Sequence, residues 1–397
     1  MIHILMDILL GKTLEELQAV AQEVGLPRFA GKQLAEWLYV RRATSFDEMT
    51  NISLKGREAL KANYTIGRHA PVAEAISKDG TKKYLFRISN SEAVQQRSGL
   101  TSNGVPEKSA DFWGASSEAV YIESVYIPDD DRATLCVSTQ AGCKMGCKFC
   151  MTGTLGFHGH LSAADILNQI FSIPDADKLT NIVYMGEGEP MDNLDNVLRS
   201  LNAMTSAWGC AWSPKRITVS SVGLLHLPHS TFNLQPSTLL QRFIEESDCH
   251  LAISLHNPFS TERQEIMPIE KVYHLSDVIA LLKQYDWTHQ RRVSFEYICW
   301  GGVNDTPKHA NELLRLLKGI DCRINLIRFH ASPIANRQSP IANSQSSIAN
   351  RGSDEQQMEW LRDYLTAHGI TTTIRRSRGE DILAACGMLV NALNEQQ

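Results

Sequence analysis

The chain has 397 residues, of which 43% are hydrophobic and 21% are charged, a composition typical of a globular protein with a sizeable core. No apolar run approaches the roughly 20 residues that cross a bilayer, no export signal is evident, and the nine cysteines are too scattered for a secreted disulfide framework, so we expect a cytoplasmic protein. The formal net charge is −5, so any nucleic-acid partner must bind local basic patches.

The N-terminal region has the apolar periodicity of helices. Residues 14–63 repeat apolar side chains at helical spacing and contain no strong strand pattern. We therefore predict a small helical accessory domain at residues 1–75.

A β-hairpin linker is predicted at residues 76–132. Its turn is Asp79-Gly80, a pair typical of tight hairpins, and an apolar strand follows it. Residues 89–117 are polar and rich in Ser and Gly, which indicates a loop insertion. A second strand is expected at residues 119–127.

From residue 133 onward, short apolar strands alternate with helical stretches. This alternation is the pattern of parallel βα units, and residues 133–397 are therefore predicted to form the catalytic core. Six strands are too few for a closed eight-stranded barrel, so we predict an α/β fold with a partial, open βα barrel, and ligands at the carboxyl ends of its strands. The candidate strands are residues 134–138, 181–185, 216–221, 250–255, 292–299 and 324–329.

Three cysteines follow the first of these strands within one short loop. Cys143, Cys147 and Cys150 form the spacing CxxxCxxC. Three thiolates can anchor a [4Fe–4S] cluster and leave its fourth iron open to a substrate. The alternative is a zinc site, which needs a fourth ligand such as Cys136 or His158.

Near the C-terminal end of the core, residues 333–353 form a low-complexity stretch. The tripeptide Ile-Ala-Asn occurs three times there among Ser, Gln and Asn residues. Two prolines oppose a helix, so we predict a surface loop.

The cysteine motif, with Phe149 before its last cysteine, resembles the radical S-adenosylmethionine (SAM) superfamily, as does the Gly188-Glu189-Pro190 turn after the second core strand. Three further segments resemble the RlmN family within it: the strand containing Glu123, residues 134–143, and residues 378–387. RlmN enzymes methylate C2 of adenosine in 23S rRNA and in tRNA. The resemblance implies this activity, with SAM and a [4Fe–4S] cluster held by the three cysteines as cofactors.

The resemblance also implies a radical mechanism that uses two SAM molecules per turnover. Cys386 would take a methyl group from one SAM, and a deoxyadenosyl radical from the second would abstract hydrogen from that methyl group. The carbon radical would add to C2 and form a covalent enzyme–RNA adduct. Glu123 would accept the C2 proton, and Cys136 would resolve the adduct by forming a disulfide with Cys386.

Several positions at strand ends match the SAM contacts of the family. His330 departs from the family pattern, which has Asn there, although His can also donate or accept a hydrogen bond. Two basic sets are candidate RNA patches: Arg375, Arg376 and Arg378, and the N-terminal set Lys55, Arg57, Lys61 and Arg68. The matching SAM-contact positions are Gly188, Glu189, Ser220, Ser254, Leu255, His256 and His330.

Two alternatives are left open by the residues. The same scaffold serves Cfr-type methylation at adenine C8, and a zinc-stabilised RNA-binding protein without catalysis would also use clustered cysteines. For the RlmN-like enzyme we expect 23S rRNA and tRNA as partners, a flavodoxin-type electron donor, no membrane association and a monomeric state.

Overall fold

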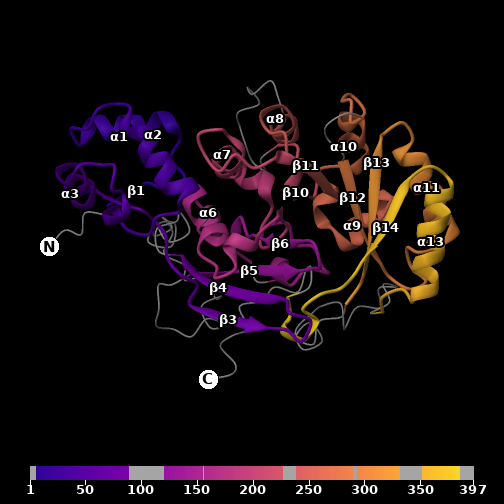
Figure 1. Ribbon diagram of the computed structural model, residues 1–397. Helices are drawn as coiled ribbons and strands as arrows, with labels where there is room; N and C mark the ends of the chain where they lie inside the picture. Colours follow the sequence, from indigo (N-terminus) through magenta and orange to yellow (C-terminus); the bar gives the residue numbers. More distant parts are fainter. Residues whose placement is uncertain are drawn as a thin grey trace, which may run out of the picture.

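The computed structural model describes residues 6–88, 120–154, 156–226, 238–288, 293–330 and 351–384. Its largest feature is a ten-stranded sheet in the order β14-β13-β12-β11-β10-β9-β6-β5-β4-β3 (Figure 1). The strands are β3 (Ala73–Ile76), β4 (Lys82–Ile88), β5 (Val120–Pro128), β6 (Ala133–Cys136), β9 (Asn181–Tyr184), β10 (Ile217–Ser221), β11 (His250–Ser254), β12 (Val293–Cys299), β13 (Cys322–Arg328) and β14 (Thr371–Arg375).

Seven neighbouring strands of this sheet are parallel and form the partial, open barrel that the sequence predicts. In sheet order they are β6, β9, β10, β11, β12, β13 and β14. All six predicted core strands are confirmed, and β14 adds a seventh parallel strand that the sequence analysis missed. On the other side of β6, the strands β5, β4 and β3 extend the sheet in antiparallel order. The sheet therefore has two different edges, β3 and β14.

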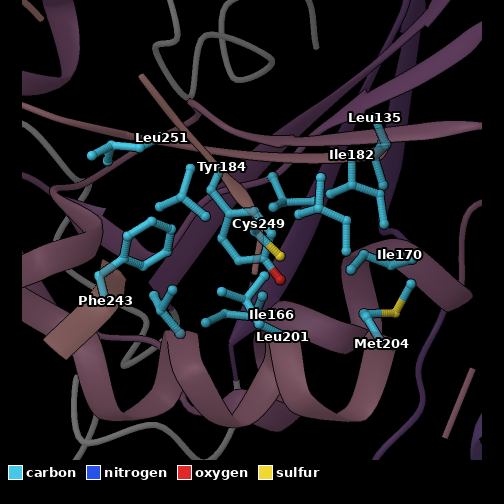
Figure 2. Packing of buried hydrophobic residues seen from close by; sticks show 14 of the residues in the cluster. Leu135, Ile166, Ile170, Ile182, Tyr184, Leu201, Met204, Phe243, Cys249 and Leu251 are labelled. Atoms are coloured by element: carbon cyan, nitrogen blue, oxygen red, sulfur yellow. The ribbon is translucent and has the colours of Figure 1, made fainter. Parts of the chain in front are cut away.

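Helices cover the outer face of the parallel strands (Figure 1). Figure 2 shows the apolar layer between β6, β9, β10, β11 and these helices, where Tyr184, Ile182 and Leu135 of the strands pack with Ile166, Leu201 and Phe243 of the helices. Burial of such side chains stabilises the fold by roughly 1.5–3 kcal/mol each. The helices are α6 (Ala163–Phe171), α7 (Leu194–Thr205), α8 (Leu239–Glu246), α9 (Ser260–Ile266), α10 (Leu275–Leu282), α11 (Pro307–Leu317) and α13 (Glu355–Ala367).

The N-terminal region is helical, as predicted, and lies beside α6 at one end of the molecule (Figure 1). Its elements are β1 (Asp7–Ile8), α1 (Leu14–Glu23), α2 (Ala30–Ala35), the π-helical turn η1 (Glu36–Val40), α3 (Leu54–Asn63) and β2 (Tyr64–Thr65).

Arg68 joins the N-terminal region to the core. Its guanidinium donates hydrogen bonds to the carbonyl oxygens of Arg42 and Phe171 and to the hydroxyl of Ser172. Burial lowers the pKa of Arg68, as expected for a cation inside an interface. The sequence predicts Arg68 as part of an N-terminal RNA patch, and its hydrogen-bond donors are directed to the core and to Arg42.

The predicted hairpin is present as β3 and β4, with Asp79 and Gly80 in the turn. The predicted loops at residues 89–117 and 333–353 fall almost entirely outside the described residues. Across the described ranges, no helix is long and apolar enough to cross a membrane.

Candidate active site

The loop with the three cysteines is closed at its base by a small hairpin. Strand β7 (Gln140–Gly142) pairs antiparallel with β8 (Phe157–His160), and Cys143 N–H donates to the Gly156 carbonyl at 3.0 Å. Gly142 has a φ of +71°, and a Cβ there would lie 1.9 Å from the Gly156 oxygen. Only glycine fits, so the hairpin fixes where the loop begins and ends.

The three thiols lie in surroundings that oppose a negative charge. Burial raises the pKa of Cys143 to about 12 and also raises the pKa of Cys147 and Cys150. Neighbouring thiolates further raise the pKa of Cys143 and Cys147. Backbone N–H groups nevertheless point at sulfur, from Met145 to Cys143 and from Gly153 to Cys150.

These features fit a cationic iron–sulfur group bound by the three sulfurs. Bound iron would stabilise the buried thiolates, and N–H donors to sulfur are a known way to tune such clusters. Within the described ranges, no three His, Cys, Asp or Glu side chains are grouped as ligands of one metal ion. A cubane instead takes one protein thiolate per iron.

Phe149, in the cysteine loop, packs against the end of β11. Its ring meets His256 edge-on at 4.9 Å between centroids and lies 5.7 Å from Trp300. His256 is held with a φ of +54°, and its Nδ1 accepts a hydrogen bond from Ile298 N–H at 3.1 Å. Because burial lowers the pKa of His256 to about 3, the ring is neutral at pH 7.

The turn after β9 presents a buried carboxylate at the end of the strands. Glu189 accepts hydrogen bonds from Met191 N–H at 3.0 Å and Val222 N–H at 2.9 Å. Burial raises the pKa of Glu189 to about 7. Gly188, with a φ of +100°, approaches Gln140 so closely that a Cβ would lie 2.6 Å from its side chain.

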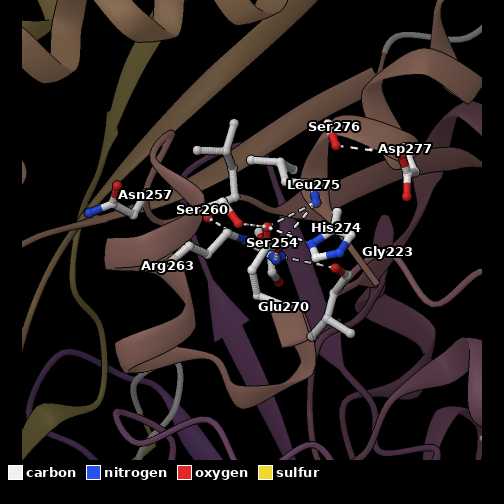
Figure 3. Close-up of polar contacts among 12 residues, drawn as sticks. Gly223, Ser254, Asn257, Ser260, Arg263, Glu270, His274, Leu275, Ser276 and Asp277 are labelled. Carbon is white, nitrogen blue, oxygen red and sulfur yellow. Dashed lines mark hydrogen bonds and ion pairs between the residues drawn. The ribbon is translucent and has the colours of Figure 1, made fainter. Parts of the chain in front are cut away.

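Arg263 is a buried cation behind the ends of β10 and β11, and the sequence analysis did not single it out. It donates to the carbonyls of Val222, Ser254 and Leu255 at 3.1, 2.9 and 3.0 Å and pairs with Glu270 (Figure 3). Its charge also favours ionisation of Cys147. The sequence of the short polar helix α9 gives no sign that this arginine is buried.

The remaining predicted SAM contacts are brought to the same region. Ser220 lies two residues beyond Thr218, and Ser254 lies four residues beyond His250. Both Thr218 and His250 line the cavity described below, so strand alternation places the two serines on the same face of the sheet. His330, after β13, lines the cavity, hydrogen-bonds Ser377 and lies 3.5 Å from a Glu380 oxygen.

A cavity of about 920 Å³ lies inside the open barrel and includes Cys136 and Cys150. Its described lining contains seven Arg and Lys side chains and no Asp or Glu. The arginines and lysines are Arg132, Lys215, Arg216, Arg323, Arg375, Arg376 and Arg378.

Two of these arginines have acidic partners just outside the lining. Arg375 pairs with Glu296 at 3.4 Å, and Arg378 pairs with Asp129 at 3.1 Å. Glu296 also accepts a hydrogen bond from Asn325 at 2.8 Å. Arg375 therefore belongs to a network across β12, β13 and β14, which the sequence analysis did not identify.

Residues 377–384 return from β14 to the opposite edge of the sheet. Gly379 N–H donates to Asp79 at 3.0 Å, and Asp381 accepts hydrogen bonds from Ser77 and from Lys78 N–H. At the end of this segment, Ala384 is buried against Val125 and Cys136. Cys386 itself lies outside the described residues.

Glu123 is fully buried in β5, on the same face as Val125. It forms an ion pair with Lys83, whose Nζ lies 3.0 Å from Glu123 Oε1. The described lining of the cavity does not include Glu123.

Comparison with known proteins defines the class first. Residues 137–317 match the family model "Radical SAM superfamily". A solved structure titled "Crystal Structure of a radical SAM methyltransferase from Sphaerobacter thermophilus" superposes with a TM-score of 0.75 at 30% identity, covering 96% of this chain and 98% of that chain. The fold and the site are thus those of a radical SAM enzyme, a class that implies SAM and a [4Fe–4S] cluster as cofactors.

The family follows from the N-terminal region and from close relatives. Residues 8–66 match the model "Ribosomal RNA large subunit methyltransferase N-terminal domain". A Bacteroides fragilis protein named "Probable dual-specificity RNA methyltransferase RlmN" is 52% identical over 98% of this chain and 97% of its own length. The "Dual-specificity RNA methyltransferase RlmN" of Syntrophobacter fumaroxidans is 35% identical over 95% and 96%. The chain belongs to the RlmN family of radical SAM RNA methyltransferases.

Proposed function

We propose that this protein methylates C2 of adenosine in 23S rRNA and in tRNA through an S-methylated Cys386 and a covalent enzyme–RNA adduct. The observation that supports this best is the packing of Ala384 against Cys136. Cys386 follows Ala384 by two residues, and two residues span at most about 7 Å. This short spacing supports a reaction between Cys386 and Cys136.

Cys143, Cys147 and Cys150 would hold the cluster in the loop closed by β7 and β8. When bound there, the cluster and SAM supply the deoxyadenosyl radical. Carbon C2 of adenine is electron-poor and lacks an acidic proton, so direct transfer from SAM has no nucleophile. A methyl group on the Cys386 sulfur provides a carbon from which hydrogen can be abstracted.

The other residues of the site would bind and orient SAM and the RNA. Glu189 and Gly188 at the end of β9, Ser220 at the end of β10, and Ser254, Leu255 and His256 at the end of β11 would contact SAM. His330 would join them, because it follows the end of β13 and lines the cavity. Arginine and lysine side chains of the cavity would bind RNA phosphates.

The protein divides into an RNA-binding accessory domain at residues 1–75, a hairpin linker at residues 76–132 and the catalytic core at residues 133–397. The enzyme acts as a monomer in the cytoplasm with a flavodoxin-type electron donor. Cys136 and Cys386 cycle between thiols and a disulfide, and the cysteines of the described part form no disulfide with one another.

The test is Cys136→Ala in the reconstituted enzyme with a tRNA or rRNA substrate. We expect this variant to methylate Cys386 and attack RNA, and then to accumulate a covalent protein–RNA species that survives denaturation. Digestion should yield a nucleotide on the peptide containing Cys386. The matched control is Cys210→Ala, because Cys210 donates to the Tyr39 carbonyl away from the cavity. Normal methylation by Cys136→Ala, with no trapped RNA, would contradict the proposal.

A further inference from the structure

A group of three ionisable side chains is buried at the antiparallel side of the sheet. Lys83 of β4, Glu123 of β5 and Glu187 of the turn after β9 are 2%, 0% and 3% exposed. Burying charges is costly even when they are paired, and an apolar set of similar volume is often at least as stable. The group therefore requires an explanation other than stability.

Strand register places this group beside the cavity. Lys83 lies opposite Val125, and Val125 lies opposite Cys136 on its other side. Paired residues share a face of the sheet, and Glu123 is two residues from Val125, so all four side chains lie on one face. Val125 and Cys136 line the cavity, and the ion pair is adjacent to that wall.

Glu187 fixes the position of Glu123. Its two carboxyl oxygens accept hydrogen bonds from Glu123 N–H at 2.8 Å and Gly142 N–H at 3.2 Å, which ties β5 to the start of the cysteine loop. Burial and the neighbouring Glu123 raise the pKa of Glu187 to about 8, so Glu187 holds a proton at neutral pH.

Titratable side chains from three elements lie near Glu123. Lys83 of β4 pairs with the Glu123 carboxyl, Glu187 lies beside it in the turn after β9, and Cys136 of β6 lies on the same face of the sheet. With Glu187 protonated and Lys83 charged, one ionised carboxylate at Glu123 leaves the group neutral.

We propose that Lys83 is a positioning residue that keeps Glu123 as an ionised carboxylate, ready to accept the C2 proton of the enzyme–RNA adduct. In that step the C2–H bond breaks, the proton moves to a Glu123 oxygen, and the electron pair of the bond stays in the adenine ring. This inference rests on the function proposed above. It adds Lys83 as the residue that keeps the base, Glu123, ionised.

The test measures resolution of the covalent adduct by Lys83→Met as a function of pH. Without the lysine, a buried carboxyl beside Glu187 is mostly protonated at pH 7, so we expect resolution to slow by about tenfold and to recover as the pH is raised toward 9. Lys83→Arg retains a cation and should restore the wild-type pH profile. Radical cleavage of SAM and methylation of Cys386 should be unchanged.

The matched control is Lys82→Met. Lys82 is the preceding residue of β4, points to the other face and pairs with Asp175 at 2.6 Å. The Lys82→Met variant should resolve the adduct with the wild-type pH profile. If Lys83→Met gives too little folded protein, Lys83→Gln takes its place, because glutamine keeps a hydrogen-bond donor without the charge.

Two outcomes separate this inference from the proposed function. A stalled adduct in Glu123→Gln together with a wild-type rate and pH profile in Lys83→Met or Lys83→Gln would overturn the role of Lys83 alone. Normal resolution in Glu123→Gln would instead remove Glu123 as the base, and the role of Lys83 with it.

Discussion

At the scale of single residues, the site depends on buried charges whose partners come from distant parts of the chain. Arg263 and Glu270 form such a pair, and Arg263 also holds three carbonyls at the ends of β10 and β11. The backbone of Ser254 and Leu255, which we expect to contact SAM, is thus positioned from behind.

Arg263→Met should destabilise the protein by about 3 to 5 kcal/mol, because Glu270 is left as an uncompensated buried charge and three carbonyls lose a donor. Chemical denaturation of the purified variant measures this loss. Arg242→Met is the control, since Arg242 pairs with Asp195 and Glu246 on an exposed helix surface and should cost less than about 1 kcal/mol. Equal losses in the two variants would show that Arg263 is no more than a surface cation.

At the scale of elements, the β3–β4 turn holds the segment before Cys386. Burial opposes ionisation of Asp79, but N–H donors from Gly379 and Thr81 prevail and lower its pKa to about 2. A lowered carboxyl pKa means that the bond to Gly379 is fully present above pH 4 and is lost only as the pH falls through about 2.

Asp79→Ala should therefore slow methyl transfer to RNA by about tenfold at pH 7, because a charge-assisted hydrogen bond no longer fixes the segment. Uncoupled cleavage of SAM, which needs only the cysteine loop, should stay at the wild-type rate. Both products can be quantified from the same reaction by mass spectrometry. The turn has no positioning role if methyl transfer and SAM cleavage fall together.

Strands with dense apolar residues could be predicted from the sequence, and those without them could not. The six core strands are rich in apolar and β-branched residues, which are typical of strands in a sheet. Strand β14 reads Thr-Thr-Thr-Ile-Arg, and as the edge of the sheet it needs little burial. The β7–β8 hairpin is equally short and depends on the Gly142 contact with Gly156, which only the folded chain reveals.

For the site, motif spacing predicted the cysteine loop, and the family resemblance supplied the candidate SAM contacts at strand ends. Neither could predict partners that are separated by long stretches of chain. Two ion pairs join different elements: Lys83 with Glu123, and Arg375 with Glu296. Each pair can be recognised only from the distance between its side chains and from their burial. The two predicted RNA patches illustrate the limit, because Arg375 of one patch and Arg68 of the other have partners within the protein.

At the scale of the whole molecule, the cavity is a cationic region in a protein of negative net charge. The net charge is −5, yet the described lining of the cavity has seven cations and no acids. Phosphate contacts release counterions, so RNA binding should weaken steeply with salt.

Arg376→Glu, a reversal at an exposed position of the cavity, should weaken RNA binding by about tenfold and lower the slope of log affinity against log salt by about 1. Lys318→Glu makes the same change of net charge outside the cavity and should leave affinity and slope nearly unchanged. Filter binding or fluorescence anisotropy over a salt series compares them. Identical effects would mean that net charge, and not the cavity, governs binding.

The segment at residues 377–384 has a consequence for the timing of catalysis. It forms part of the cavity wall, yet polar bonds to Ser77 and Asp79 of the β3–β4 turn and to Asp129 after β5 hold much of it. Such a segment opens by local unfolding at a much lower free energy than the core of the sheet. We therefore expect the wall beside Cys136 to open and reclose more often than the strands of the sheet, which would let a finished RNA leave without a wider rearrangement of the barrel.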